Sequence, residues 1–474
     1  MKKRSATSDA ATPDPANAEL PEGWTLVSIR DIAEINPRHP KGLDDSMRIS
    51  FAPMAALSET GPAFDHLEER PYGEVRKGFT HFGEGDVLFA KITPCMENGK
   101  GAVATCLRNG IGCGTTELHV LRPRGGIDAI YLYRFLSQYH VRRDAKETFT
   151  SSAGQARVPS QFLTDLEIPL PPLAEQKRIV VKVEELLARV NATRDRLAKV
   201  SAILKRFRQS VLAAACSGRL TEEWQRAEGA PDWEDKSLGE MAKLVTSGSR
   251  GWAKHYADSG PIFIRAQNLS SDCLDLSDVA HVQLPDRGEG TRTLVSLNDI
   301  LVTITGANVT KTAIVFENIG EAYVNQHVAL VRLHKSEHAP YVWLWLISPD
   351  HGRSQLLEAA YGAGKPGLNL KQVRALHVRL PHLPEQHEIV RRVEGLFALA
   401  DSIEKQVAAG MARAEKLTQA ILAKAFRGGL VPQDSTDESA SVLLERIRIA
   451  RTAATETQVR RGRISGKRKV TSHQ

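Results

Sequence analysis

The sequence predicts an α+β protein in which two tandem α/β domains are separated by two long helices that form an antiparallel coiled coil. Three observations predict this fold: an internal pseudo-two-fold repeat of about 210 residues, a long proline-free segment at the same place in each copy, and an apolar period of seven in both segments. A chain of 474 residues is long enough for two to four domains.

The repeat is clearest in the two helical segments. Residues 170–220 align without a gap with residues 380–430, and 19 of the 51 aligned positions are identical. Outside the helices, Tyr131 and Tyr341 fall at equivalent positions. Because a period of this length is far too long for a solenoid, we interpret the chain as a tandem duplication.

The repeat and its helix boundaries divide the chain into seven parts. Prolines suit the first turn of a helix and a glycine suits its end, and both long segments are bounded in this way. The leader begins with basic residues but lacks the apolar stretch of a signal peptide. The predicted parts are a disordered leader (1–19), a first α/β domain (20–169), a first long helix (170–220), a linker (221–230), a second α/β domain (231–379), a second long helix (380–430), and a C-terminal segment (431–474) with a basic, disordered tail.

Each α/β domain is predicted from strand-like apolar runs and one buried helix. The runs are DVLFAKI (86–92), ELHVLR (117–122), PIFIRA (261–266), DILVTIT (299–305) and HVALVRL (327–333). The buried helices are predicted at residues 131–140 and 341–348. The two domains differ in sequence over most of their length while the long helices agree, which suggests related folds that bind different things.

Both long helices repeat an apolar residue every seven positions, which is typical of a coiled-coil seam. The alternative is that each helix packs only on its own domain. Antiparallel pairing follows if each domain connects the end of one helix to the other helix. The predicted seam consists of Val183, Leu186, Val190, Leu197, Leu204, Phe207 and Val211 in the first helix and Val393, Leu396, Ile403, Val407, Leu417 and Ile421 in the second.

The net charge of +7 does not by itself indicate DNA binding. Residues 446–474 hold nine Lys and Arg against one acidic residue, whereas residues 20–169 and 231–379 are slightly acidic. The first long helix is basic, and three interpretations of its positive side chains stay open: phosphate contacts, a docking face for a partner, or a solvated surface. These side chains are Lys199, Lys205, Arg206 and Arg208.

The sequence shows no recognisable catalytic or metal-binding motif. It lacks a GxxxxGK[ST] phosphate loop and the Asn/Asp-Pro-Pro-aromatic motif of amino-methyltransferases. Cys95, Cys106, Cys113 and His119 match no zinc-ligand spacing, so we interpret them as small core residues and a strand histidine and predict no metal site. Five cysteines, an odd number, favour a reducing cytoplasm over a disulfide framework. We predict no catalytic residues.

The helical segments resemble a known family. LPPLAEQKRIV together with residues 203–224 resembles the first conserved helical region of the specificity subunit of type I restriction–modification systems, and residues 388–430 resemble the second. GDVLFAKITPCMENGKGA (85–102) is similar to a sequence of the family's target-recognition domains. SASVLLERIRIARTAA (439–454) is similar to the K-type (type IA) subfamily. The resemblance covers residues 20–454, and the helices carry most of its specificity.

The resemblance implies a cytoplasmic DNA-reading subunit that is not an enzyme on its own. Each target-recognition domain would read one half of a bipartite, asymmetric site in double-stranded DNA. Two modification subunits would methylate adenine N6, and two restriction subunits would translocate and cleave the DNA. These partners would use S-adenosylmethionine, ATP and magnesium, while this chain would bind no cofactor and no membrane. The alternatives are a self-contained methyltransferase–nuclease and a coiled-coil adaptor unrelated to DNA.

Base readout needs Arg or Lys for guanine, Asn or Gln for adenine, and Ser or Thr for either, on loops that reach a groove. For each candidate the alternative is a solvated loop, and phosphate contacts are commoner than base contacts. We also consider Trp252 as a wedge or stacking surface. The predicted DNA-contacting residues are Lys91, Thr93, Asn98, Lys100, Ser152, Gln155 and Arg157 in the first domain and Ser249, Arg250, Lys254, Arg265, Thr305, Asn308, Lys311, Lys365 and Asn369 in the second.

Overall fold

The computed structural model describes residues 20–149, 156–248, 251–283, 292–361 and 366–449. It divides into two compact units: unit 1 comprises residues 1–196 and 410–474, and unit 2 comprises residues 197–409. Each long helix therefore contributes to both units. The predicted leader and the end of the predicted basic tail lie outside the described residues, whereas residues 440–449 are helical.

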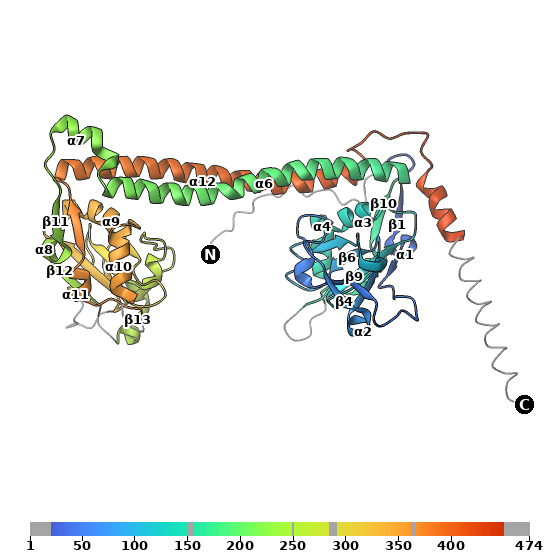
Figure 1. Ribbon diagram of the computed structural model, residues 1–474, viewed down its shortest axis with the longest axis horizontal. Helices are drawn as coiled ribbons and strands as arrows, with labels where there is room; N and C mark the ends of the chain where they lie inside the picture. The colour runs from blue at the N-terminus through green and yellow to red at the C-terminus, as the bar shows by residue number, and fades with distance from the viewer. Residues whose placement is uncertain (1–19, 150–155, 249–250, 284–291, 362–365, 450–474) are drawn as a thin grey trace, which may run out of the picture. The chain divides into compact units, whose positions relative to one another are not determined.

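Unit 1 is built around two four-stranded sheets, with strand orders β2-β9-β6-β7 and β4-β3-β8-β5 (Figure 1). A separate two-stranded ladder joins β1 to β10. The elements are β1 (Thr25–Ser28), α1 (Ile29–Ile32), β2 (Ala33–Ile35), β3 (Arg48–Ala52), β4 (Glu68–Pro71), α2 (Tyr72–Val75), β5 (Thr80–Gly83), β6 (Val87–Ala90), β7 (Gly101–Val103), β8 (Ile111–Gly114), β9 (Leu118–Pro123), α3 (Ala129–Leu136), α4 (Tyr139–Glu147), α5 (Ser160–Asp165) and β10 (Glu167–Leu170).

The sheet β2-β9-β6-β7 is buried on both faces, which explains why β6 is apolar throughout. Leu88 packs in the core that also contains Phe82 of β5, between the two sheets. Val87 and Phe89, which alternate with Leu88, pack with Tyr131 of α3 in the other core. Side chains of successive strand residues point to opposite faces, so one short strand supplies both cores.

Unit 2 repeats this plan. Its four-stranded sheet has the order β12-β18-β15-β16, a three-stranded sheet has the order β14-β13-β17, and β11 pairs with β19. The elements are α7 (Glu222–Glu228), β11 (Glu234–Ser237), α8 (Leu238–Met241), β12 (Ala242–Ser247), β13 (Tyr256–Ile264), β14 (Ala280–Val282), β15 (Ile300–Thr303), β16 (Thr312–Ile314), β17 (Ala322–Val324), β18 (Val328–Leu333), α9 (Ala339–Ile347), α10 (Gly352–Tyr361), α11 (Leu370–Arg374) and β19 (His377–Leu380).

The five predicted strand-like runs contain or overlap β6, β9, β13, β15 and β18, and the helix predicted at 341–348 corresponds to α9. The helix predicted at 131–140 is divided in two, because α3 ends at Leu136 and α4 begins at Tyr139. The segment 221–230, which was predicted as a linker, contains the helix α7. Two acidic residues in its first turn and the left-handed Gly229 at its end stabilise this short helix.

The two long helices, α6 (Leu173–Cys216) and α12 (Leu383–Ala425), pair in antiparallel fashion (Figure 1). In unit 1 the first half of α6 shares a core with the last part of α12, where Val183 and Ile421 are both buried. In unit 2 the last part of α6 shares a core with the first half of α12, through Val211 and Val393. Both cores also include the adjoining sheet, so the helices pack on each other and on the domains.

Most predicted seam residues are at least half-buried, and the prediction is wrong at Leu417. Val183, Val190, Leu204, Val211, Val393 and Ile421 are buried, and Leu186, Leu197, Phe207, Leu396, Ile403 and Val407 are half-buried. The Leu417 side chain is 51% exposed, while Ala414 is buried. A helix of 3.6 residues per turn drifts relative to a strict period of seven, which carries Leu417 off the inward face.

Polar contacts between the helices occur within each unit. Arg208 contacts Asp401 at 2.5 Å and Glu404 at 2.8 Å in unit 2, and Arg194 lies 3.6 Å from Glu415 in unit 1. Arg208 therefore belongs to the helix pair rather than to a free basic face. The other three predicted basic-face residues, Lys199, Lys205 and Arg206, are exposed. Among the described residues, none of the helices combines the length and the apolar character that crossing a membrane requires.

Candidate nucleic-acid interface

In unit 1, two of the predicted loops meet beyond the end of β6. Ile92 forms an isolated antiparallel bridge with Arg157, and the Val158 amide donates a hydrogen bond to the Lys91 carbonyl at 2.9 Å. The loop at 91–100 and the segment at 156–158 are therefore adjacent. Ser152 and Gln155, which were predicted in the second of these loops, lie outside the described residues.

Unit 2 brings its two corresponding loops together in the same way. Thr305, just after β15, bridges Gly367, and the Leu368 amide donates to the Ile304 carbonyl at 2.8 Å. Lys365 in this second loop lies outside the described residues. In both units a loop following a central strand thus pairs with a loop from the end of the domain.

In the unit 1 loops, the Arg157 side chain is held by an acidic neighbour. Arg157 donates from Nε and Nη2 to the Glu117 carboxylate at 2.8 and 2.9 Å, and this contact lowers the pKa of Glu117. Lys91 is half-buried beside this pair. The bidentate contact fixes the direction of the guanidinium.

The other three predicted residues of unit 1 are also hydrogen-bonded within the domain. The Thr93 hydroxyl donates to Glu97 at 2.5 Å, Asn98 Nδ2 donates to Glu59 at 3.3 Å, and Lys100 Nζ donates to a backbone carbonyl at 3.5 Å. These contacts order the loop in the absence of a ligand. A ligand that binds these side chains must replace their hydrogen bonds within the domain.

Sequence reasoning missed two basic residues beside this loop. On α4, Arg142 Nη1 donates to the Glu97 carbonyl at 3.4 Å, and Lys146 Nζ contacts the Glu97 carboxylate at 2.5 Å. Their i, i+4 spacing places both on one face of α4. That spacing is visible in the sequence, but only the fold brings the helix against the loop.

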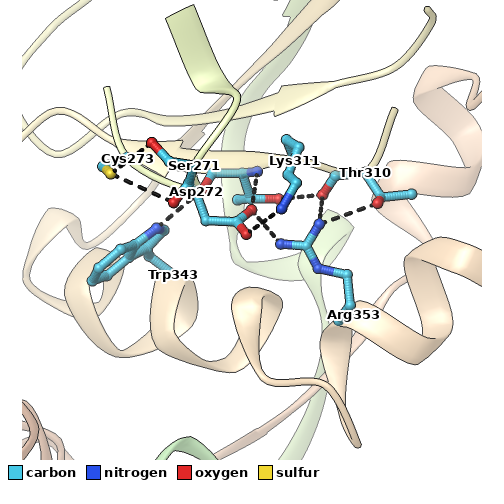
Figure 2. Close-up of polar contacts among 8 residues, drawn as sticks. Ser271, Asp272, Cys273, Thr310, Lys311, Trp343 and Arg353 are labelled. Carbon is cyan, nitrogen blue, oxygen red and sulfur yellow. Dashed lines mark hydrogen bonds and ion pairs between the residues drawn. The ribbon is translucent and has the colours of Figure 1, made fainter. Parts of the chain in front are cut away.

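In unit 2, Asp272 organises the loop that follows β15 (Figure 2). Its carboxylate contacts Lys311 Nζ at 2.9 Å and Arg353 Nη2, and it accepts a hydrogen bond from the Thr312 amide at 3.1 Å. Arg353 Nη1 also donates to the Thr310 hydroxyl at 3.1 Å. Lys311, predicted to contact DNA, is therefore placed in an internal ion pair that holds the end of this loop.

The remaining described candidates of unit 2 have local partners. Asn308 Nδ2 donates to the Ala266 carbonyl at 3.2 Å, and Arg265 lies 3.6 Å from Asp278. Thr305 contacts His327. Asn369 caps α11, because its side chain accepts a hydrogen bond from the Gln372 amide at 2.9 Å.

Trp252 does not serve as a wedge, and the interpretation of it as an exposed stacking surface is wrong. Its ring is buried and stacks on Phe263, with ring centroids 5.2 Å apart, and also contacts Tyr323. A large aromatic side chain gains more from this core than from solvent. Ser249 and Arg250 lie outside the described residues, as does the side chain of Lys254.

An aspartate–arginine pair supports the start of each central strand. In unit 1, Asp86 contacts Arg122 through both oxygens at 2.8 Å and accepts from the Gly83 amide at 2.6 Å. In unit 2, Asp299 contacts Arg332 at 2.8 and 2.7 Å and accepts from an amide three residues earlier at 2.7 Å. The motifs GDVL (85–88) and NDIL (298–301) contain these two aspartates and are the sequence signal of the pair.

The junction between each domain and its long helix is also duplicated. Trp24 Nε1 donates to Glu175 at 3.0 Å in unit 1, and Trp233 Nε1 donates to Glu385 at 3.0 Å in unit 2. Both carboxylates lie in the first turn of a long helix, where the helix dipole favours negative charge. The domains are thus attached to the helices by the same contact.

Comparison with known proteins decides the family. The model of the type I restriction modification DNA specificity domain matches residues 21–202 and again residues 231–410. The chain belongs to this family. One match falls in each copy of the repeat, and each match extends from the α/β domain into the long helix that follows it.

Curated specificity subunits resemble the chain over most of its length. The subunit of the type I restriction enzyme EcoBI from Escherichia coli is 39% identical over 330 residues, which cover 64% of this chain and 69% of that subunit. The EcoKI subunit from Escherichia coli strain K12 is 32% identical over 354 residues, with 71% and 74% covered. The EcoAI subunit from Escherichia coli is 27% identical over 476 residues, with 81% and 79% covered.

Two solved chains from type I restriction–modification systems share the fold. A chain from a structure of the type I R-M system, described by its complex assembly and conformational transition, has a TM-score of 0.70 at 21% identity, with 87% of this chain and all of that chain covered (100%). The HsdS subunit from Thermoanaerobacter tengcongensis has a TM-score of 0.52 at 21% identity, with 87% and 99% covered. The chain is accordingly a specificity subunit with two specificity domains and a pair of long helices.

Proposed function

We propose that the two domains of this specificity subunit read the two unlike halves of a bipartite, asymmetric site in double-stranded DNA. One observation supports this most directly: both units present two paired loops at the same edge of the same sheet, yet the loops carry different side chains. A duplicated scaffold with unlike loops suits a reader of two different half-sites on one side of a duplex.

In this proposal the chain catalyses no step and acts in the cytoplasm within a larger complex. Two modification subunits transfer methyl groups from S-adenosylmethionine to adenine N6, and two restriction subunits use ATP and magnesium to translocate and cleave. The long helices separate the half-sites and carry the modification subunits, and the exposed Lys199, Lys205 and Arg206 on α6 are candidates for contacting them or the DNA backbone.

The test is a domain exchange read out by methylome sequencing. Residues 20–169 are replaced by the corresponding segment of the EcoBI subunit, and the complete system is expressed in a host without other methylation. We expect one half of the methylated motif to change and the other half to persist. The reciprocal exchange of residues 231–379 should change the other half. A motif altered in both halves by either exchange would contradict the proposal.

Two further measurements separate this function from its alternatives. The purified chain alone should transfer no methyl group to DNA, since activity without partners would indicate a self-contained enzyme. The complete complex should bind the split site with an affinity that falls steeply with salt, because phosphate contacts release counterions. An adaptor unrelated to DNA would show no preference for that site.

A further inference from the structure

Three buried side chains from distant parts of the chain meet in unit 1. His39 lies in the loop before β3, His81 lies in β5 and Cys113 lies in β8, and their potential ligand atoms all lie within 4.8 Å of one another. His81 and Cys113 are directly opposite in the antiparallel β5–β8 ladder, so their side chains project from the same face. The His39 and His81 rings stack with centroids 4.3 Å apart.

Both imidazoles already make the outer hydrogen bond that orients a metal-ligating histidine. His39 Nε2 lies 2.9 Å from the Phe82 carbonyl, and His81 Nε2 lies 2.9 Å from the Arg76 carbonyl. A ring nitrogen that contacts a carbonyl oxygen must carry the proton, which leaves the lone pair on Nδ1 in each ring. Both Nδ1 atoms are therefore in the state that binds a metal.

No hydrogen-bond partner of His39 Nδ1 lies among the residues that the structure describes. The atom is buried without a hydrogen bond, in a residue that is 8% exposed. His81 Nδ1 accepts one long hydrogen bond, 3.4 Å, from the His39 amide. An unpaired buried acceptor destabilises the folded protein, so this arrangement is unfavourable unless something else uses the lone pair.

We propose that unit 1 binds one zinc ion through His39 Nδ1, His81 Nδ1 and Cys113 Sγ. Two imidazole nitrogens and one thiolate are ligands that Zn²⁺ prefers, and three protein ligands leave one coordination position open. Bonds of about 2.0–2.3 Å require the ligand atoms to approach to about 3–4 Å of one another, so the site contracts slightly on binding.

Burial shifts the pKa of two of these side chains before a metal binds. Burial lowers the pKa of His39, which keeps its imidazole neutral. Burial also raises the pKa of the Cys113 thiol to about 12, so the thiol holds its proton until a metal replaces it. Binding then releases one proton, and the Sγ–Zn bond takes the place of the S–H bond.

The site joins a loop to two strands of the second sheet of unit 1. Cys113 packs there with Ile49, Phe51, Tyr72 and Val75 in a small core. In unit 2 the second sheet has three strands, and Trp252, Phe263, Val282 and Tyr323 form its small core. A zinc ion would supply in unit 1 a cross-link that aromatic packing supplies in unit 2.

No sequence motif reveals this site, because its three ligands lie far apart in the chain. In the sequence Cys113 lies closer to His119, but the two ring nitrogens of His119 already contact the Val158 carbonyl at 2.9 Å and the Asn36 amide group at 3.3 Å. Cys106 is exposed. The sequence predicts no metal site, whereas the proposed site combines Cys113 with His39 and His81.

The test uses the purified full-length chain, stripped of metal with a chelator and titrated with Co²⁺. We expect one equivalent of cobalt with a thiolate-to-cobalt charge-transfer band, which Zn²⁺ then abolishes. Cys113→Ser should lose the band and weaken binding at least tenfold. Cys216→Ser is the matched control, because Cys216 is another buried thiol whose pKa burial raises to about 12. Cobalt uptake below one equivalent, or a band that persists in Cys113→Ser, would overturn the proposal.

A second measurement does not depend on the cysteine variant folding. Zinc should raise the thermal unfolding midpoint of unmodified protein and of Cys216→Ser, since a ligand that binds the folded state stabilises it by mass action. Elemental analysis of protein grown with equal zinc and copper should then find zinc. An unchanged midpoint at saturating zinc, or bound copper instead of zinc, would reject the assignment.

Discussion

At the scale of single residues, buried carboxylates fix the parts of each unit that precede the loops at 91–100 and 304–311. Asp86 has a side chain that is 1% exposed, and it holds both Arg122 and the turn that starts β6. Asp299 does the same with Arg332 before β15. Because the loops at 91–100 and 304–311 directly follow these strands, the carboxylates set where the loops begin.

Replacing Asp86 tests this role. Asp86→Ala leaves Arg122 and the Gly83 amide without their acceptor, and we expect a loss of about 2–4 kcal/mol in the stability of unit 1. Hydrogen–deuterium exchange measured on peptides of β6 reports this opening free energy separately from unit 2. Glu69→Ala is the control, because Glu69 pairs with Arg48 while half exposed, and it should change exchange by about 0.5 kcal/mol or less. Equal effects of the two substitutions would refute the role.

Glu175 gives the junction with the first long helix a dependence on pH. Burial raises its pKa above the usual value of 4.5, although the Trp24 hydrogen bond opposes this shift. The folded state therefore holds the proton to a higher pH than the unfolded state, and this contribution to stability is present below pH 4.5 and lost as the pH rises through the folded pKa. Relative to Glu175→Gln, the unmodified protein should gain stability as the pH falls from 7 towards 4.5. Thermal melts of both proteins over that pH range measure the difference in stability. A difference that does not change with pH would exclude this role of Glu175.

At the scale of elements, the stability contributed by an apolar residue of α6 depends on whether its side chain faces inward. Leu204 is buried, whereas its neighbour Ile203 is 53% exposed. We expect Leu204→Ala to cost about 2–4 kcal/mol in urea unfolding, because it removes packing and leaves a cavity. Ile203→Ala should change stability by about 0.5 kcal/mol or less, since alanine also favours the helix. A smaller loss of stability for Leu204→Ala than for Ile203→Ala would show that Leu204 does not lie in the seam.

The elements that sequence predicts well are those with local signals. The heptads predicted the paired helices, and the apolar runs predicted β6 and β15, because each pattern depends on residues a few positions apart. The short β7 and β16 carry too few residues for such a pattern. At the loops, sequence identified candidate side chains but not their partners, so the ion pair of Lys311 with Asp272 and the burial of Trp252 appeared only in the fold. Contacts between distant segments have no sequence period to reveal them.

At the scale of the whole molecule, duplication allows the two domains to attach to the long helices in the same way while their loops differ. The junctions, such as Trp24 with Glu175 and Trp233 with Glu385, repeat the same chemistry, so both domains attach to the helices alike. The loops are free of that constraint and differ between the copies. A single chain can in this way present two unlike reading surfaces where a homodimer would present two identical ones.

Lengthening both long helices tests whether they set the gap between half-sites. One heptad added to α6 after Arg196 and to α12 after Ala409 keeps the seam in register and adds about 10 Å. This corresponds to about three base pairs of duplex, which turns the distant half-site well away from the original face. We therefore expect methylation of the original motif to be lost. Three added heptads give about 31 Å, close to one turn of DNA, and should restore methylation at a motif whose gap is longer by nine or ten base pairs, roughly one turn. Methylome sequencing reads both outcomes, with native mass spectrometry to confirm that the complex still assembles. An assembled complex that methylates the original motif with an unchanged gap would show that the helices do not measure the distance.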